Sequence, residues 1–156
     1  MDEIAGASCA SQRHGHRLLQ GGGLLFLLGL LVGLAVPRFA VPRLGLSTHL
    51  LGIAQGTFLM VAGLLWPRLR LTRRVSGIGC GLAIYGCTAA WTANLCGAFW
   101  GAGGAMAPIA AGGAQGSALQ EGLIKVLLMS GAVALISASV LIVWGLRVLP
   151  QAASRE

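Results

Sequence analysis

The chain alternates between long apolar stretches and short connections that hold almost all of its charged residues. Four of the apolar stretches have about the 20 residues that a helix needs to cross a bilayer. The four predicted spans are Leu18–Val36, Leu46–Trp66, Val75–Trp100 and Leu119–Leu146. The pattern therefore predicts an all-α fold, an integral membrane four-helix bundle in which each span is one helix.

Prolines and hydroxyl side chains predict the ends of these helices. Pro37 should end the first helix and Pro67 the second, because proline disrupts a helix beyond its first turn. Ser47 or Thr48 can cap the start of the second helix. The third connection, 101–116, holds six glycines and six alanines. We expect it to cap the bundle or to re-enter the membrane, since irregular backbone survives at that depth only where protein covers it.

The positions of the arginines predict the orientation of the chain. Basic residues gather in the N-terminal tail, the second connection and the C-terminal end, whereas the first connection holds two arginines and the third none. By the positive-inside rule, both termini face the cytoplasm of a bacterial inner membrane. This arrangement predicts a mobile N-terminal tail (1–16), a four-span transmembrane domain (17–147) and a C-terminal tail (148–156).

Composition excludes several classes of function. Of the 156 residues, 56% are hydrophobic and only 10% charged, against about a quarter charged in a soluble domain. The connections are too short to form a soluble catalytic domain, so any chemistry takes place in the membrane or at its edge. The net charge of +7 is not arranged as a basic stripe with aromatic residues. The expected surroundings are membrane lipid, and we expect no nucleic-acid partner.

A single histidine, His49, lies within the predicted spans, near the outer end of the second. Ionisable residues are costly inside a membrane and are functional candidates by default. Gln55 lies about 9 Å deeper on the same helix and about 120° around its axis. These two side chains should therefore face different spaces, one toward a cofactor or a neighbouring subunit and the other toward a substrate.

The predicted topology brings three further polar residues toward the same outer half. Tyr85 lies near mid-depth in the third span, Asn94 lies toward its outer end, and Glu121 lies at the start of the fourth. Together with His49 and Gln55, these residues predict a pocket for a small apolar molecule that carries one polar group.

Each of these residues also has a structural interpretation. His49 could donate to a carbonyl at the interface, and Gln55 could join two helices by a hydrogen bond. Tyr85 could be a packing residue whose hydroxyl is satisfied locally. Glu121 stands four residues before Lys125, the favourable order for an ion pair along a helix.

Glycines recur at a spacing of four within the spans. Small residues at this spacing let membrane helices approach closely. We expect them to pack helices within one bundle rather than to define a particular contact between subunits. The pairs are Gly29 with Gly33, Gly52 with Gly56 and Gly77 with Gly81.

Five stretches of the chain carry a resemblance to known proteins. They are PRLGLSTHLLGIAQGTFL, GLLWPRLRL, LAIYGCTAAW, PIAAGGAQGSALQE and VWGLR. In these stretches the chain resembles the hydroxylaminobenzene mutase family, small four-span membrane proteins, over roughly Leu24 to Arg147. It is more distantly similar to styrene oxide isomerase, which shares a histidine followed six residues later by a carboxamide and then by glycine.

The resemblance implies a cofactor, an assembly and an activity. The isomerase is a trimer that binds ferric haem b through this histidine, so His49 would be the axial ligand of the haem iron. Gln55 would lie on the substrate side, where the family usually has asparagine. The implied reaction is the isomerisation of a small aromatic substrate, hydroxylaminobenzene to 2-aminophenol, with haem iron as the Lewis acid. The candidate catalytic residues are Gln55, Tyr85, Asn94 and Glu121.

Other functions stay open. One is an aryl epoxide isomerase that gives an aldehyde, although the isomerase's pocket tyrosine and aspartate fall on Asn94 and Gly86. A second is a haem electron carrier, but such carriers generally use two histidines, and His14 and His16 precede the first span. A third is a small-molecule transporter, which would need an ionisable residue deeper in the membrane than Glu121.

Overall fold

The computed structural model describes residues 2–147, with side chains from residue 11 onward, and within this range the regular structure is entirely helical. The long helices are α1 (Asp2–Ala35), α2 (Pro42–Leu65), α3 (Arg73–Trp100) and α5 (Ala118–Gly145). Short helix α4 (Pro108–Ala111) and the 3-10 turns Val36–Arg38 and Trp66–Arg68 lie in the connections.

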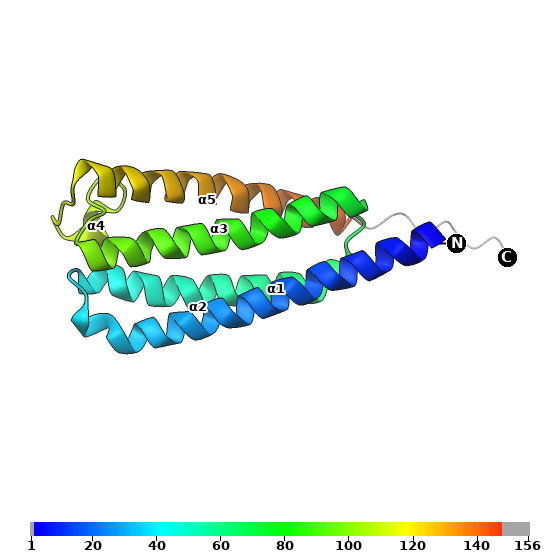
Figure 1. The fold of residues 1–156 in the computed structure, drawn as a ribbon, viewed down its shortest axis with the longest axis horizontal. Coiled ribbons are helices and arrows are strands. Elements are labelled where there is room, and N and C mark those ends of the chain that lie inside the picture. The colour runs from blue at the N-terminus through cyan, green and yellow to red at the C-terminus, as the bar shows by residue number, and fades with distance from the viewer. Residues whose placement is uncertain (1, 148–156) are drawn as a thin grey trace.

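The long helices lie side by side in two antiparallel pairs, α1 with α2 and α3 with α5, and α2 also packs on α3 (Figure 1). Helix α1 begins and α5 ends at the same end of the molecule, which we call the terminal end. Helix α4 and its flanking segments lie at the opposite end, the cap end. The predicted all-helical fold is confirmed in this arrangement.

Three stretches of the described chain are long and apolar enough to cross a membrane. They are Ser11–Arg38, Pro42–Arg68 and Ala118–Gly145. Helix α3 has a similar length, but its glycines and threonines and Tyr85 lower its mean hydropathy. Its membrane crossing, the third predicted span, therefore stays a prediction that rests on its position between α2 and α5.

Two of the predicted helix ends are confirmed and one predicted start is wrong. The first two helices give way to 3-10 turns that contain Pro37 and Pro67. The second helix begins at Pro42, four residues before the predicted Leu46, and neither Ser47 nor Thr48 caps it. Proline is well tolerated in the first helical turn, where its missing N–H would have no partner. The Thr48 hydroxyl instead donates to the carbonyl of the residue four positions earlier, at 2.7 Å.

The predicted N-terminal tail, 1–16, belongs from Asp2 onward to helix α1. Gly15 already packs on α2, where an added Cβ would lie 2.8 Å from the Gly63 carbonyl oxygen. The mobility of this segment stays a prediction, and the predicted C-terminal tail, 148–156, lies outside the described residues.

Glycines bring α1 and α2 into backbone contact at three levels. The contacts are Gly15 with Gly63, Gly22 with Gly56 and Gly29 with Gly52. A Cβ added at any of these glycines would lie 2.7–3.0 Å from atoms of the opposite helix. Close packing by Gly29, Gly52 and Gly56 is thus confirmed. Gly81 instead faces open space, with no atom within 4 Å of an added Cβ, so it joins no helices within this chain.

The connection 101–116 forms a cap over one end of the bundle, one of the two forms that the sequence predicts. Its Ala102 and Ala111 are buried and pack among side chains of the long helices. Gly101 and Gly112 have φ of 65° and 60°, values that glycine adopts at little cost. The glycines therefore provide the turns and the alanines provide the covered surface.

Candidate active site

His49 lies on α2 near the cap end, with its imidazole against α1. Its Nδ1 is 2.8 Å from the carbonyl oxygen of Gly29. A carbonyl oxygen only accepts, so Nδ1 carries the proton and donates it to this bond. In the neutral ring, Nε2 then keeps a free lone pair, the tautomer that binds a metal through Nε2.

Gly33 makes room for this imidazole. A Cβ added at Gly33 would lie 2.5 Å from Nδ1 of His49 and 2.7 Å from the neighbouring ring carbon. The Gly29 carbonyl and the bare backbone at Gly33 together fix the ring in one orientation. Such a hydrogen bond to the second ring nitrogen is the usual support of a ligating histidine.

The imidazole lines an open, apolar hollow of about 570 Å³ on the α1–α2 face. The hollow is lined by Leu30, Leu31, Gly33, Leu34, Val36, Pro37, Leu46 and His49. His49 is the only residue of this lining with a side chain that can bind a metal. The hollow is therefore suited to a flat apolar group that carries a metal and needs one axial ligand, as haem does.

The donor set also favours a metal that brings most of its own ligands. Among the described side chains, residues 11–147, no three His, Cys, Asp or Glu side chains come together as they would around a bare metal ion. A metal held at His49 would then rely on a macrocycle for its other ligands, so the residues present fit a haem.

Gln55 lies on another face of α2, about 120° around the helix from His49. It is 8% exposed, and its Oε1 is buried without a hydrogen-bond partner among the described residues. The Nε1 of Trp91, on α3, is likewise buried and unpartnered. Trp91 was not among the predicted site residues, because a tryptophan in an apolar helix most often serves packing alone.

Tyr85 and Asn94 of α3 have partners close by. The Tyr85 hydroxyl is 2.7 Å from the Ser130 hydroxyl of α5, and Ser130 also bonds the carbonyl oxygen of Val126 at 2.7 Å. Asn94 Nδ2 donates to the carbonyl oxygen of Ala90 at 3.0 Å. Asn94 lines a small space beneath the cap, away from the hollow at His49.

Glu121 lies at the start of α5 and holds the cap in place. Its Oε1 accepts the backbone N–H groups of Gly103 at 2.7 Å, Gly104 at 3.2 Å and Gly116 at 3.1 Å. Its Oε2 accepts the N–H of Ala105 at 3.2 Å. One carboxylate therefore binds both ends of the cap. Glu121 makes these hydrogen bonds instead of the predicted ion pair with Lys125.

The five candidate residues thus divide into separate settings within one chain. His49 and Gln55 face different spaces, as their 120° separation predicts, while Tyr85 bonds α5 and Glu121 bonds the cap. Their catalytic roles stay predictions. Two buried atoms have no hydrogen-bond partner within the described residues, the Oε1 of Gln55 and the Nε1 of Trp91.

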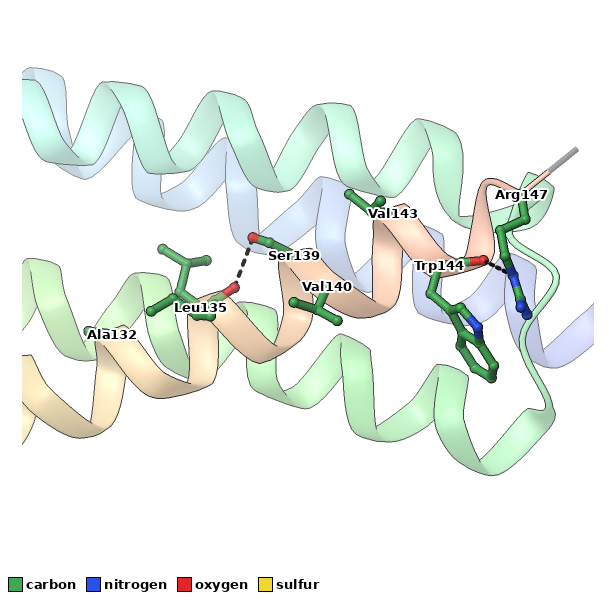
Figure 2. A pocket seen from close by; sticks show the side chains of 8 residues that line it. Ala132, Leu135, Ser139, Val140, Val143, Trp144 and Arg147 are labelled. Atoms are coloured by element: carbon green, nitrogen blue, oxygen red, sulfur yellow. Dashed lines mark hydrogen bonds between the residues drawn. The ribbon is translucent and has the colours of Figure 1, made fainter.

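A larger hollow, about 790 Å³, lies along the outer face of α5. Figure 2 shows its lining, which is apolar between Ala132 and Val143 except for Ser139. The Ser139 hydroxyl donates within the helix to the carbonyl oxygen of Leu135 at 2.9 Å, and the Arg147 guanidinium lies 4.3 Å from the Trp144 ring centre. Apart from Ser139 and Arg147, the groove presents apolar side chains, which suit contact with lipid or a neighbouring helix.

Comparison with known proteins matches the family described as styrene oxide isomerase over residues 14–147. The chain is 51% identical over 134 residues to Hydroxylaminobenzene mutase HabB of Ectopseudomonas oleovorans, covering 86% of this chain and 82% of that protein. It is 41% identical over 129 residues to Hydroxylaminobenzene mutase HabA of the same organism, covering 83% of this chain and 96% of the relative. No solved structure is a match.

Proposed function

The chain belongs to the styrene oxide isomerase family and is an isomerase, and from this premise we propose that it rearranges a small aryl substrate within the membrane. The substrate that we propose is hydroxylaminobenzene and the product is 2-aminophenol. The resemblance of the sequence and the names of the two relatives, at 51% and 41% identity, support this choice.

An aryl epoxide is the second candidate substrate, because the family is described by that reaction. It is less well supported by the residues present. Asn94 and Gly86 occupy the positions where the resemblance places a pocket tyrosine and an aspartate. Gly86 has no side chain, and a Cβ there would lie 2.9 Å from the backbone of α5, so this position serves packing.

The structural observation that carries the proposal is the setting of His49. A protonated Nδ1 bonded to Gly29, a free Nε2 and an apolar hollow at Gly33 support haem b held through His49. When bound, haem iron would supply a Lewis acid for the oxygen of the substrate.

The rearrangement is redox-neutral. The N–O bond breaks, a C–O bond forms at the ortho carbon of the ring, that carbon loses a proton, and a proton ends on nitrogen. The chain contributes an apolar lining that keeps water from the electron-poor aryl species. Gln55 contributes a carboxamide whose Oε1 has no partner among the described residues and which can orient a polar group of the substrate.

The same proposal includes the membrane arrangement and the assembly. We propose a four-span bundle in a bacterial inner membrane with both termini in the cytoplasm, because α1 begins and α5 ends at one end of the molecule. We also propose a homotrimer, as the resemblance implies. Leu34 and Leu46 are 81% and 49% exposed beside the hollow at His49, which supports coverage of that face by a second copy.

The direct test is product analysis with membranes that contain the protein. They are incubated without oxygen with phenylhydroxylamine (hydroxylaminobenzene) and, separately, with styrene oxide. We expect 2-aminophenol from the first and little phenylacetaldehyde from the second. Phenylacetaldehyde alone would replace the mutase with the epoxide isomerase, and no product from either would contradict the proposed function.

A variant tests the role of His49. We expect His49→Ala to lose both the haem absorption band and the isomerase activity. The control is His16→Ala, whose side chain is exposed on α1 and which should keep both. An active His49→Ala protein would contradict the assignment of His49 as the haem ligand.

A further inference from the structure

The apolar groove on α5 has one charged side chain, and it lies at the terminal end. The groove has a volume of about 790 Å³, and Figure 2 shows Trp144 and Arg147 together at this end of it. Its other polar residue, Ser139, uses its hydroxyl hydrogen within the helix, in the bond to the carbonyl oxygen of Leu135 at 2.9 Å. The groove is thus apolar along its length and positively charged at one end.

The apolar part of the groove matches the depth of one membrane leaflet. From Ala132 to Trp144 a helix rises by about 18 Å, at 1.5 Å per residue, and half of the hydrocarbon core of a bilayer is about 15 Å thick. Helix α5 is one of the stretches long and apolar enough to cross a membrane. Tryptophan is enriched at the level of the lipid headgroups. With Trp144 at that level, the groove reaches the middle of the bilayer, as one acyl chain does.

The guanidinium of Arg147 is fixed in place and still has donors for a ligand. Its Nε donates to the carbonyl oxygen of Trp144 at 2.7 Å, and its central carbon lies 4.3 Å from the centre of the Trp144 ring. These contacts use one of the five N–H groups of the guanidinium and one face of its plane. The N–H groups of the two terminal nitrogens can bind two oxygens of one phosphate side by side.

The surroundings of Arg147 are basic. The backbone N–H of Arg70 donates to the carbonyl oxygen of Gly145 at 3.0 Å, so the connection between α2 and α3 lies against the end of α5. A Cβ added at Gly145 would lie 3.2 Å from the Cβ of Leu69, which shows how close this approach is. Among residues 11–147 the only carboxylate is that of Glu121, at the cap end. The described part of the terminal end therefore has positive charge and no carboxylate to balance it.

We propose that the groove binds one anionic phospholipid from the leaflet at the terminal end. An acyl chain lies along Ala132–Val143, and Arg147 donates to the phosphate. A zwitterionic headgroup fits less well, because its ammonium would lie beside Arg70 and Arg147 and like charges repel at short range. This binding does not depend on which substrate the isomerase takes.

A second copy of this chain fits the groove less well than a lipid does. Copies of one chain share one orientation in a membrane, because the same charges orient each of them. A helix of a neighbouring copy in the groove would therefore bring its own arginine-rich terminal end to the level of Arg147. None of the carboxylates within residues 11–147 lies at that level to offset the repulsion, whereas a phospholipid brings its own negative charge.

Native mass spectrometry of the full-length protein in detergent tests the preference for anionic lipid. The protein is titrated with dioleoylphosphatidylglycerol and, separately, with dioleoylphosphatidylethanolamine, which has the same chains and a zwitterionic headgroup. We expect tighter binding of the phosphatidylglycerol. Arg147→Gln should weaken that binding about fivefold, the usual contribution of one basic residue near anionic lipid, and should leave phosphatidylethanolamine unaffected. Equal affinity of the unaltered protein for the two lipids would overturn the proposal.

Arg17→Gln is the matched control for charge. Arg17 is an exposed arginine of α1, a helix that packs on α2 and α3 and does not line the groove. The substitution removes the same charge, and the affinity for phosphatidylglycerol should stay unchanged. An equal loss in Arg17→Gln and Arg147→Gln would indicate diffuse attraction to a basic surface and would overturn the site.

Two tryptophan substitutions test the apolar part of the groove. Val140 lines the groove and Val133 does not, although both are exposed valines of α5, at 61% and 65%. Val140→Trp should fill the groove and weaken phosphatidylglycerol binding at least as much as Arg147→Gln does, while Val133→Trp should not. Unchanged binding in Val140→Trp would overturn the placement of the acyl chain. If the same spectra also showed fewer subunits in Val140→Trp, the groove would be a contact between copies.

Glycerol 3-phosphate, a headgroup without acyl chains, distinguishes a lipid site from a simple anion site. We expect no saturable binding of this compound, because the groove contributes only through the chain. Binding as tight as that of the whole lipid, lost in Arg147→Gln, would replace the lipid site with an anion site.

Discussion

Two tryptophans in the same chain show how differently buried polar groups are treated at the two ends of the bundle. At the terminal end, Trp66 donates to Ser76, and Ser76 also lies 3.1 Å from Nδ1 of His14. Nearer the cap end, Trp91 and Gln55 are also buried, yet Nε1 of Trp91 and Oε1 of Gln55 have no partner among the described residues. The buried hydrogen bonds of Trp66 are therefore satisfied, whereas those of Trp91 and Gln55 are not satisfied by the described residues.

We interpret this difference as one between structural polar residues and candidate functional ones. A satisfied buried hydrogen bond contributes about 1 kcal/mol to stability, whereas an unpaired buried group costs about 1–3 kcal/mol. The unpaired atoms of Trp91 and Gln55 thus lower the stability of the chain unless a partner binds them. The paired indole of Trp66 carries no such cost. Charge or polarity in a membrane helix is therefore a weaker guide to function than the absence of a partner.

The largest effect on stability is expected at Glu121, whose carboxylate is satisfied by backbone N–H groups of the cap. Glu121→Ala removes an acceptor of four backbone N–H groups. We expect the free energy of unfolding to fall by about 2–3 kcal/mol, because bonds to a charged group are strong. Unfolding in mixed detergent micelles measures this change. Glu121→Gln, which keeps one acceptor oxygen, should recover part of it, and no recovery would count against the cap contacts.

The next effect is expected at Gly33. In Gly33→Ala, the new methyl group would lie 2.5 Å from Nδ1 of His49 and displace the ring. Loss of such support typically costs about 10- to 100-fold in metal affinity, so haem titration followed by absorbance should show a drop of this size. Gly23→Ala is the matched control, because nothing lies within 4 Å of its Cβ. Equal haem affinity in both variants would place the ligand elsewhere.

A smaller effect on turnover is expected at Gln55, together with an unchanged or higher free energy of unfolding. Gln55→Leu should lower turnover about tenfold, which corresponds to one lost hydrogen bond in the complex. The haem spectrum should persist, and the free energy of unfolding should hold or rise, because an unpartnered acceptor is removed. Gln20→Leu, at an exposed position on α1, is the control. A marked loss of stability in Gln55→Leu would show that the carboxamide is structural.

The smallest effect is expected at Ser76. Ser76→Ala leaves Nε1 of Trp66 without its acceptor, which should lower the free energy of unfolding by about 1 kcal/mol. Turnover, measured in the folded protein, should change by less than about twofold, as for most substitutions away from a site. A greater loss of activity than in Gln55→Leu would reverse the comparison between the two regions.

Hydropathy was sufficient to predict the helices, since burial in lipid leaves few other options for the backbone. Pro37 and Pro67 predicted helix ends well, because a proline inside a helix removes a bond. The start of the second helix at Pro42 was not predicted. Proline ends a helix from within but is harmless in its first turn, and local sequence does not distinguish these two cases. The glycines that pack α1 on α2 were only partly predicted, because the rotation of each helix is set by its neighbours.

The candidate site was predicted less completely. His49 was identified because its cost in lipid can be read from residue type alone. Its bond to Gly29 and its space at Gly33 depend on how α1 lies against α2. Trp91 was missed because the sequence shows that a tryptophan is present but not that its N–H is unpaired. Glu121 illustrates the same limit. Its carboxylate can bind either Lys125 or the backbone of the cap, and the sequence alone does not show which.

The carboxylate of Glu121 fastens the cap at Gly103–Ala105 and again at Gly116. The stretch between these two points is held at both ends by one carboxylate, while Ala111 within it is buried against side chains of α2 and α3. A change in the length of this stretch would therefore disturb either the hydrogen bonds to Glu121 or the packing of Ala111. Chimeras that exchange this stretch should keep the fold only where the new segment preserves both contacts.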